Sequence, residues 1–273
     1  MKFHIAAAAA AILACSSVSA QAQDTDPPGD FTVSGSVAIV SDYRFRGVSQ
    51  TDEEMAVQGG VSVAHKSGLY AGTWGSNLAG WGTFGGANIE LDLYGGYKIA
   101  LGEGSALDVG LTWYMYPGGA DDTDFAEAYV KLSGSLGPVS ALAGVAYAPK
   151  QEALGNFSAT PESNGQSEDN LYLWTDLSSG VPGSPVTLKA HLGYSNGNPG
   201  LGPNGTSVAP TGEYLDWLVG ADVAVGPLTL GVAYTDTNIT RSESAYLLPN
   251  FSSTKDGSSI AGSQVVFSVS AAF

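Results

Sequence analysis

The sequence contains one cysteine, three histidines and few charged residues, which excludes several kinds of chemistry. The cysteine is Cys15, in the N-terminal leader, so the rest of the chain is predicted to have no disulfide and no thiolate site. Charged residues make up 13% of the chain, and 10 Lys and Arg stand against 26 Asp and Glu. The formal charge of −16 argues against nucleic-acid binding, which requires a basic surface.

Long hydrophobic runs are also missing beyond the leader, where no segment approaches the ~20 apolar residues of a membrane helix. Residues 1–22 have the features of a signal peptide: Lys2 is positive, an apolar stretch follows, and small residues near 18–22 form a cleavage pattern. The predicted organisation is a signal peptide over 1–22 and one mature domain over 23–273. The residues before Cys15 also resemble a lipoprotein cleavage box, so lipidation of Cys15 stays open as an alternative to its removal.

The residues that are abundant favour β structure, with 37 glycines and 10% aromatics. The last ten residues read QVVFSVSAAF, and Val265, Phe267, Val269 and Phe273 fall at alternate positions. A period of two predicts a strand with an apolar and a polar face. In a bilayer this strand would close a barrel, with its terminal aromatic residue at the interface. The alternative is a surface strand of a secreted sandwich.

Further segments alternate in the same way, and together they make about twelve predicted strands. They are 31–40, 55–64, 69–77, 88–101, 106–116, 124–135, 139–148, 169–177, 186–194, 213–225, 228–235 and 264–273. Long and short connections mostly alternate along the chain, as in barrels with long external loops and short periplasmic turns. The sequence therefore predicts an all-β, transmembrane, antiparallel up-and-down β-barrel in the cell outer membrane, with both termini periplasmic.

The polar face of each strand is predicted to line the lumen, because a Lys or Arg facing lipid costs about 2–4 kcal/mol at the midplane. Two interpretations stay open for these side chains. They could pair with one another, such as Glu90 or Asp92 with Lys98 or Lys131, and fill the interior. They could instead line a narrow channel, cation-favouring because of the acidic balance and constricted by tyrosines. The lumen-facing candidates are Glu90, Asp92, Tyr94, Lys98, Asp108, Tyr114, Glu127, Tyr129, Lys131, Asp176, Lys189, His191, Asp216 and Asp222.

The first predicted external loop contains the candidates Asp42, Arg44 and Arg46. On an extended chain the two arginines point the same way, since they are two residues apart. Near Asp42 they could clamp a carboxylate or a phosphate. The alternative is a salt bridge to the acidic residues 52–54 that folds the loop.

Several segments resemble the TorF family of porins, outer-membrane β-barrels of proteobacteria. They are SDYRFRGVSQTD at 41–52, GLYAGTWGSN at 68–77, IELDLYGGY at 89–97, the YPG corner at 116–118 and AGVAYAP at 143–149. The first two are the specific ones, and the later strands match only in pattern. The resemblance implies a porin-like role without defining a substrate.

No enzyme, cofactor or metal site is predicted. After the leader the histidines are His65, in a turn, and His191, on a lumen face, and the two are far apart in sequence. Three aspartates at 121, 122 and 124 lack the spacing of an EF-hand.

The predicted function is passive diffusion of small polar solutes or ions across the outer membrane. The alternative is a structural or ligand-binding barrel with an occluded lumen that acts through its external loops. The predicted partners are outer-membrane lipid, lipopolysaccharide, small polar solutes and the barrel-insertion machinery, which would recognise the strand ending in Phe273. The transported solute and the oligomeric state stay open.

Overall fold

The computed structural model describes residues 29–102, 104–120, 122–155, 167–197, 212–246 and 251–273. The predicted signal peptide at 1–22, with Cys15, lies outside the described residues, as does Asp121. Parts of three long connections, at 156–166, 198–211 and 247–250, lie outside them too.

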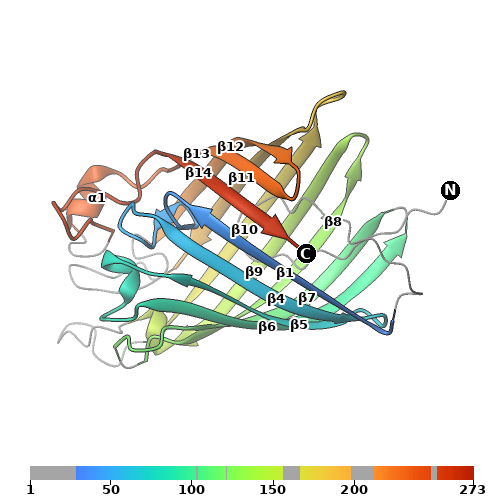
Figure 1. The fold of residues 1–273 in the computed structure, drawn as a ribbon. Helices are drawn as coiled ribbons and strands as arrows, with labels where there is room; N and C mark the ends of the chain where they lie inside the picture. The colour runs from blue at the N-terminus through green and yellow to red at the C-terminus, as the bar shows by residue number, and fades with distance from the viewer. Residues whose placement is uncertain (1–28, 103, 121, 156–166, 198–211, 247–250) are drawn as a thin grey trace.

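Twelve antiparallel strands form a closed barrel, which confirms the predicted fold class (Figure 1). Each strand pairs with its neighbours along the chain, and β1 closes the cylinder by pairing with both β4 and β14. The barrel strands are β1 (Phe31–Val40), β4 (Ala56–His65), β5 (Leu69–Asn77), β6 (Ile89–Gly102), β7 (Ser105–Met115), β8 (Phe125–Leu136), β9 (Val139–Gln151), β10 (Glu168–Gly180), β11 (Val186–Asn196), β12 (Glu213–Val225), β13 (Leu228–Thr237) and β14 (Gln264–Ala272).

The connections differ in length at the two ends of the barrel. The end with the long connections is called the loop end, and the end with the short turns and the ends of β1 and β14 is called the turn end. The short helix α1 (Arg241–Tyr246) lies at the loop end, on the left of Figure 1. The turns after β8 and β12 each need only two residues, with Gly137 and Gly226 in the left-handed region.

The two faces of the barrel wall separate as the alternation predicts. The outward positions of the closing strand, Val265, Phe267 and Val269, are exposed on the outer surface. Phe273 is 69% exposed, and its backbone exchanges two hydrogen bonds with Gly35 of β1. Val266, which breaks the apolar alternation of the sequence, faces inward and packs on the buried core. The outside is therefore an apolar band, and polar side chains lie inside.

Two short strands were not predicted: β2 (Arg44–Phe45) and β3 (Val48–Ser49). They pair as a small antiparallel hairpin inside the connection from β1 to β4, here called loop 1 (residues 41–55). The helical segments are α1 and the 3-10 turns η1 (Gly80–Thr83) and η2 (Glu152–Leu154). No helical segment within the described residues has the length and apolar character needed to cross a bilayer.

Candidate functional site: the lumen and its inward-folded loop

On strands β6 to β10, inward side chains become more buried toward the loop end. Along β6, Glu90 and Asp92 are buried, Tyr94 and Lys98 are half-buried, and Ala100 is exposed. The inward positions of β7, β8, β9 and β10 follow the same order. Since these residues all face the same interior, the lumen is filled at the loop end and accessible to water at the turn end.

A hydrophobic cluster drawn from several connections fills the loop end. Loop 1 contributes Tyr43, Phe45 and Val48, which meet aromatic side chains of the wall and of other loops. The Phe45 and Tyr114 rings lie 5.8 Å apart in an edge-to-face arrangement, and Tyr114 stacks on Phe125 at 4.5 Å. Other loops contribute Leu78, Trp81, Phe84, Tyr116, Leu154, Ile239, Phe251 and Ile260.

Arg46 extends from loop 1 to the barrel wall and is almost completely buried, with 1% of its side chain exposed. Its Nη2 lies 2.5 Å from Oε1 of Glu127, on β8, and its Nη1 lies 2.6 Å from Oδ1 of Asn170, on β10. The guanidinium carbon lies 4.0 Å from the ring centre of Tyr172. Burial lowers the pKa of Arg46, but the Glu127 carboxylate, Tyr114 and Tyr172 together raise it more, so the pKa lies above its usual value. The group is therefore a buried cation paired across the lumen.

Local backbone geometry aims Arg46 inward. Its φ is 49°, and the φ of Gly47 is 79°, so two consecutive residues are in the left-handed region between β2 and β3. A Cβ at position 47 would lie 2.5 Å from Cγ2 of Thr237 and 2.9 Å from Cβ of Asp216. Glycine thus lets the hairpin turn pack directly against the wall.

Tyr43 attaches loop 1 to a second part of the wall, on β5 and β6. Its hydroxyl donates to Oε2 of Glu90 at 3.0 Å, and its ring lies edge-to-face with Trp74 at 5.5 Å. Burial raises the pKa of Tyr43 well above its usual value, and the carboxylates of Glu90 and Asp92 raise it further. The phenol therefore stays protonated and acts as a donor to Glu90.

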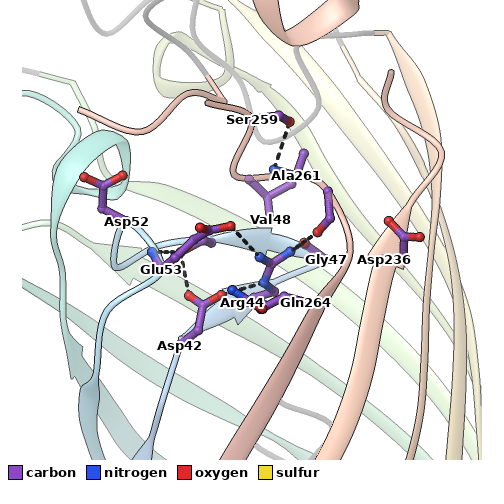
Figure 2. A network of polar contacts seen from close by, with 12 residues as sticks. Asp42, Arg44, Gly47, Val48, Asp52, Glu53, Asp236, Ser259, Ala261 and Gln264 are labelled. Atoms are coloured by element: carbon purple, nitrogen blue, oxygen red, sulfur yellow. Dashed lines mark hydrogen bonds and ion pairs between the residues drawn. The ribbon is translucent and has the colours of Figure 1, made fainter. Parts of the chain in front are cut away.

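Arg44 organises loop 1 itself (Figure 2). Its Nε donates to Asp42 at 2.6 Å, its Nη2 to Glu53 at 3.2 Å, and its Nη1 to the carbonyl oxygens of Gly47 and Gly262. The loop-folding salt bridge is therefore present for Arg44, with Glu53 as its acidic partner from residues 52–54.

The prediction that the two arginines point the same way is wrong, because the left-handed residues 46 and 47 interrupt the extended chain. Arg46 is also not an external residue: it lies in the lumen. The clamp proposed for the pair is absent, since Arg44 and Arg46 bind different carboxylates. The remaining acidic residues bind the last long connection: Asp52 accepts from Thr254, and Glu54 pairs with Lys255.

Toward the turn end, the inward charges pair with neighbours on adjacent strands. Lys131 lies 3.3 Å from Asp108, which also accepts from the Tyr70 hydroxyl at 2.6 Å. Lys131 covers the ring of Tyr129, with its Nζ 4.1 Å from the ring centre. Lys189 pairs with Asp222 at 2.8 Å. These ion pairs between neighbouring strands hold the charged side chains in place along the lumen wall.

The suggested pairing of Glu90 or Asp92 with Lys98 or Lys131 is wrong. The two acids lie near the loop end, where Glu90 accepts from Tyr43, and the lysines lie nearer the turn end. Oδ1 of Asp92 is buried without a hydrogen-bond partner among the described residues. Lys98 is directly opposite Asp108 in the β6–β7 register. The alternation of side chains shows which face a residue lies on, but not its distance along the barrel axis. That distance separates the two acids from the two lysines.

His191 lies at the centre of a polar cluster on the other side of the lumen. Its Nδ1 is 2.6 Å from Asp176, and its Nε2 is 3.1 Å from Asp216 and 2.9 Å from the Tyr172 hydroxyl. Tyr172 also carries the cation–π contact to Arg46, so the cluster borders the loop 1 contact.

The segment GYSNG at 193–197 matches the G-x-S-x-G pattern of hydrolases, a match that the sequence-based assignment of no enzyme overlooked. In the structure the segment continues β11 to its end and has no strand–turn–helix geometry. Ser195 accepts a hydrogen bond from Asn170 at 3.2 Å, and within the described residues no bond joins it to His191. No group of three or more His, Cys, Asp or Glu side chains among those residues is arranged to hold a metal ion.

Residues 24–273 match the model of a family described as a bacterial protein of unknown function, Gcw_chp. The chain belongs to this family. The match covers nearly all of the predicted mature domain and establishes a bacterial family, whereas membership of the TorF family stays a prediction. No curated protein matches the sequence.

Several solved structures are similar to this chain over most of its length. A porin refined at 1.8 Å is 11% identical, with a TM-score of 0.43 over 89% of this chain and 100% of its own. An outer membrane channel from Pseudomonas putida F1 is 10% identical, with a TM-score of 0.42 over 92% and 100%. The translocator domain of the autotransporter NalP from Neisseria meningitidis is 13% identical, with a TM-score of 0.43 over 88% of both chains. These likenesses are weak, and the fold assignment rests on the closed strand pairing of this chain.

Proposed function

We propose that the protein is an outer-membrane channel for small polar solutes or ions, held closed at the loop end by loop 1. The apolar outer surface, the unequal connections and the TorF resemblance support a membrane location. The observation that carries the proposal is the buried contact of Arg46 with Glu127, which holds a loop across a polar lumen. In this proposal the gate opens when the contact is released and closes when it forms.

In this proposal the turn end faces the periplasm, and the lumen is filled from the external side. Solutes cross by passive diffusion when loop 1 is released. Lipid and lipopolysaccharide surround the apolar band, and the insertion machinery recognises the strand ending in Phe273. The lumen is assigned no catalytic role, in keeping with a Ser195 hydroxyl that Asn170 engages.

A second candidate is a ligand-binding or structural barrel that stays occluded and acts through its external loops. The hydrophobic cluster at the loop end favours it, because Phe45, Trp81 and Phe251 join three connections in one core. Such a core resists a loop movement more than a single ion pair does.

Single-channel recording in a planar bilayer separates the two candidates. We expect the wild type to be closed most of the time, with rare current steps. Arg46→Ala is expected to raise the open probability at least tenfold, because Glu127 then loses its buried partner. Arg241→Ala removes an exposed arginine at the loop end and serves as the matched control. The channel proposal fails if Arg46→Ala inserts as a folded, heat-modifiable barrel and passes no current.

A further inference from the structure

The guanidinium of Arg46 occupies a site that the barrel wall builds largely without the loop. Glu127 supplies a carboxylate oxygen from β8, Asn170 an amide oxygen from β10, and Tyr172 an aromatic face, also from β10. Glu127 and Asn170 are both fully buried. Loop 1 adds the ring of Phe45, 4.8 Å from the guanidinium carbon.

Other wall residues hold two of these three groups, Asn170 and Tyr172, in position. Nδ2 of Asn170 donates to Ser195 at 3.2 Å, which directs its oxygen toward Arg46. The Tyr172 hydroxyl binds Asp216 and His191, which fixes the ring. None of these contacts involves loop 1, so the positions of Asn170 and Tyr172 do not depend on contacts with the loop.

The chemistry of the site matches a planar cation with several donors. Two acceptors bind two separate nitrogens, and the aromatic face covers the plane of the charge. Nε of Arg46 has no hydrogen-bond partner among the described residues, so the site binds the two terminal nitrogens of the guanidinium and not the nitrogen that carries the side chain. Asp92 is also buried, and its Oδ1 has no hydrogen-bond partner among the described residues, so a second donor of a ligand could use it.

We infer that this is a lumen binding site for cationic solutes with a guanidinium or amidinium head, and that Arg46 is its tethered occupant. A free solute of this class competes with Arg46 and thereby releases loop 1. The inference rests on the proposed function in one respect, namely that loop 1 is a removable closure. The binding site itself does not depend on conductance.

A thermal-unfolding assay in detergent tests the site directly, with methylguanidinium as the probe and the neutral isostere methylurea as its control. The full-length Arg46→Ala variant has a vacant site, so millimolar methylguanidinium is expected to raise its Tm by about 2–4 °C. Methylurea should leave the Tm unchanged, and Arg46→Ala/Glu127→Gln should respond to neither. Arg46→Gly also leaves the site vacant and suits the positive φ at this position, so it replaces Arg46→Ala in the assay should the latter not fold.

Planar-bilayer recording tests the competition. Methylguanidinium is expected to raise the open probability of the wild type and of the Arg241→Ala control. In Arg46→Ala it should instead reduce the current, because it binds in the open lumen. Both effects should be lost with Glu127→Gln.

The outcomes separate the two proposals. A conducting Arg46→Ala barrel that methylguanidinium neither stabilises nor blocks overturns the binding site and leaves the channel intact. A silent barrel that methylguanidinium stabilises through Glu127 overturns the channel and supports the site. Stabilisation that is equal with methylurea, or that survives Glu127→Gln, overturns the site.

Discussion

Arg46 and Glu127 form an ion pair that water does not reach, with 1% and 0% of their side chains exposed. Removing one partner of such a pair leaves an uncompensated buried charge, which costs about 3–5 kcal/mol. We therefore expect Arg46→Ala to destabilise the barrel by that amount when loop 1 stays packed, and by less when loop release lets water reach Glu127. The measurement is urea or thermal unfolding in detergent micelles.

A double-mutant cycle identifies the pair as the cause. Arg46→Ala/Glu127→Gln should be more stable than Arg46→Ala alone, because the buried position then carries no charge. Arg241→Ala should unfold as the wild type does. A double variant that loses the sum of the two single losses would show that the residues act independently.

Lys98 lies among the half-buried inward residues near the turn end, where an ion would pass it. In the open Arg46→Ala background, we expect Lys98→Glu to shift the reversal potential in a salt gradient toward greater cation selectivity, since it exchanges a positive for a negative wall charge. Lys66→Glu is the matched control, because Lys66 lies in an exposed turn and pairs with Asp30. Equal shifts for the two variants would contradict the position assigned to Lys98.

At the scale of elements, the β2–β3 hairpin depends on a glycine that no other residue replaces without strain. Gly47→Ala should displace loop 1, because the new Cβ would meet Thr237 and Asp216 and because φ is positive. We expect a higher open probability in bilayer recordings and a loss of about 1–2 kcal/mol of stability.

The control variant Gly257→Ala separates the two effects expected for Gly47→Ala, the steric contact of the new Cβ and the backbone strain. Gly257 also has a positive φ, but a Cβ there meets nothing within 4 Å. It should share the backbone cost without opening the lumen. If both variants open the barrel equally, the close approach of Gly47 to the wall is not what holds the hairpin.

The barrel strands could be predicted from the sequence, and the hairpin could not. Val265, Phe267 and Val269 alternate with small or polar residues because lipid and lumen impose opposite chemistry on successive side chains. Loop 1 has no such periodic constraint: its inward course depends on Arg46 meeting Glu127 and Asn170, which are distant in sequence. Gly47, which suits the second position of a tight two-residue hairpin, is the local signal that could have indicated the reversal.

The sequence could predict which residues of the candidate site face the lumen, but not their positions along the barrel axis. Alternation placed Glu90, Asp92 and Lys98 on the same face of β6, where the structure has them. The alternation could not show that Glu90 and Asp92 lie under loop 1, whereas Lys98 lies nearer the water-accessible turn end. The pairing of Glu90 with Tyr43, a residue of loop 1, follows from that difference.

The whole molecule is a barrel that is filled at the loop end and open to water at the turn end. The four carboxylates Glu90, Asp92, Glu127 and Asp216 are buried at or near the filled end, where Arg46 is the cation bound to the wall. Release of loop 1 would leave a ring of acids there, which favours cations.

Thiol labelling along β9 tests this arrangement most directly, since the predicted mature chain has no cysteine. Ser140→Cys faces the lumen at the turn end, Ala148→Cys faces it under loop 1, and Ala143→Cys faces outward. With a charged, membrane-impermeant maleimide, we expect Ser140→Cys to react only after the outer membrane is permeabilised. Ala148→Cys should react only when Arg46→Ala is also present, and Ala143→Cys should not react. Labelling of Ala148→Cys in intact cells that retain Arg46, or of Ala143→Cys under either condition, would contradict the account.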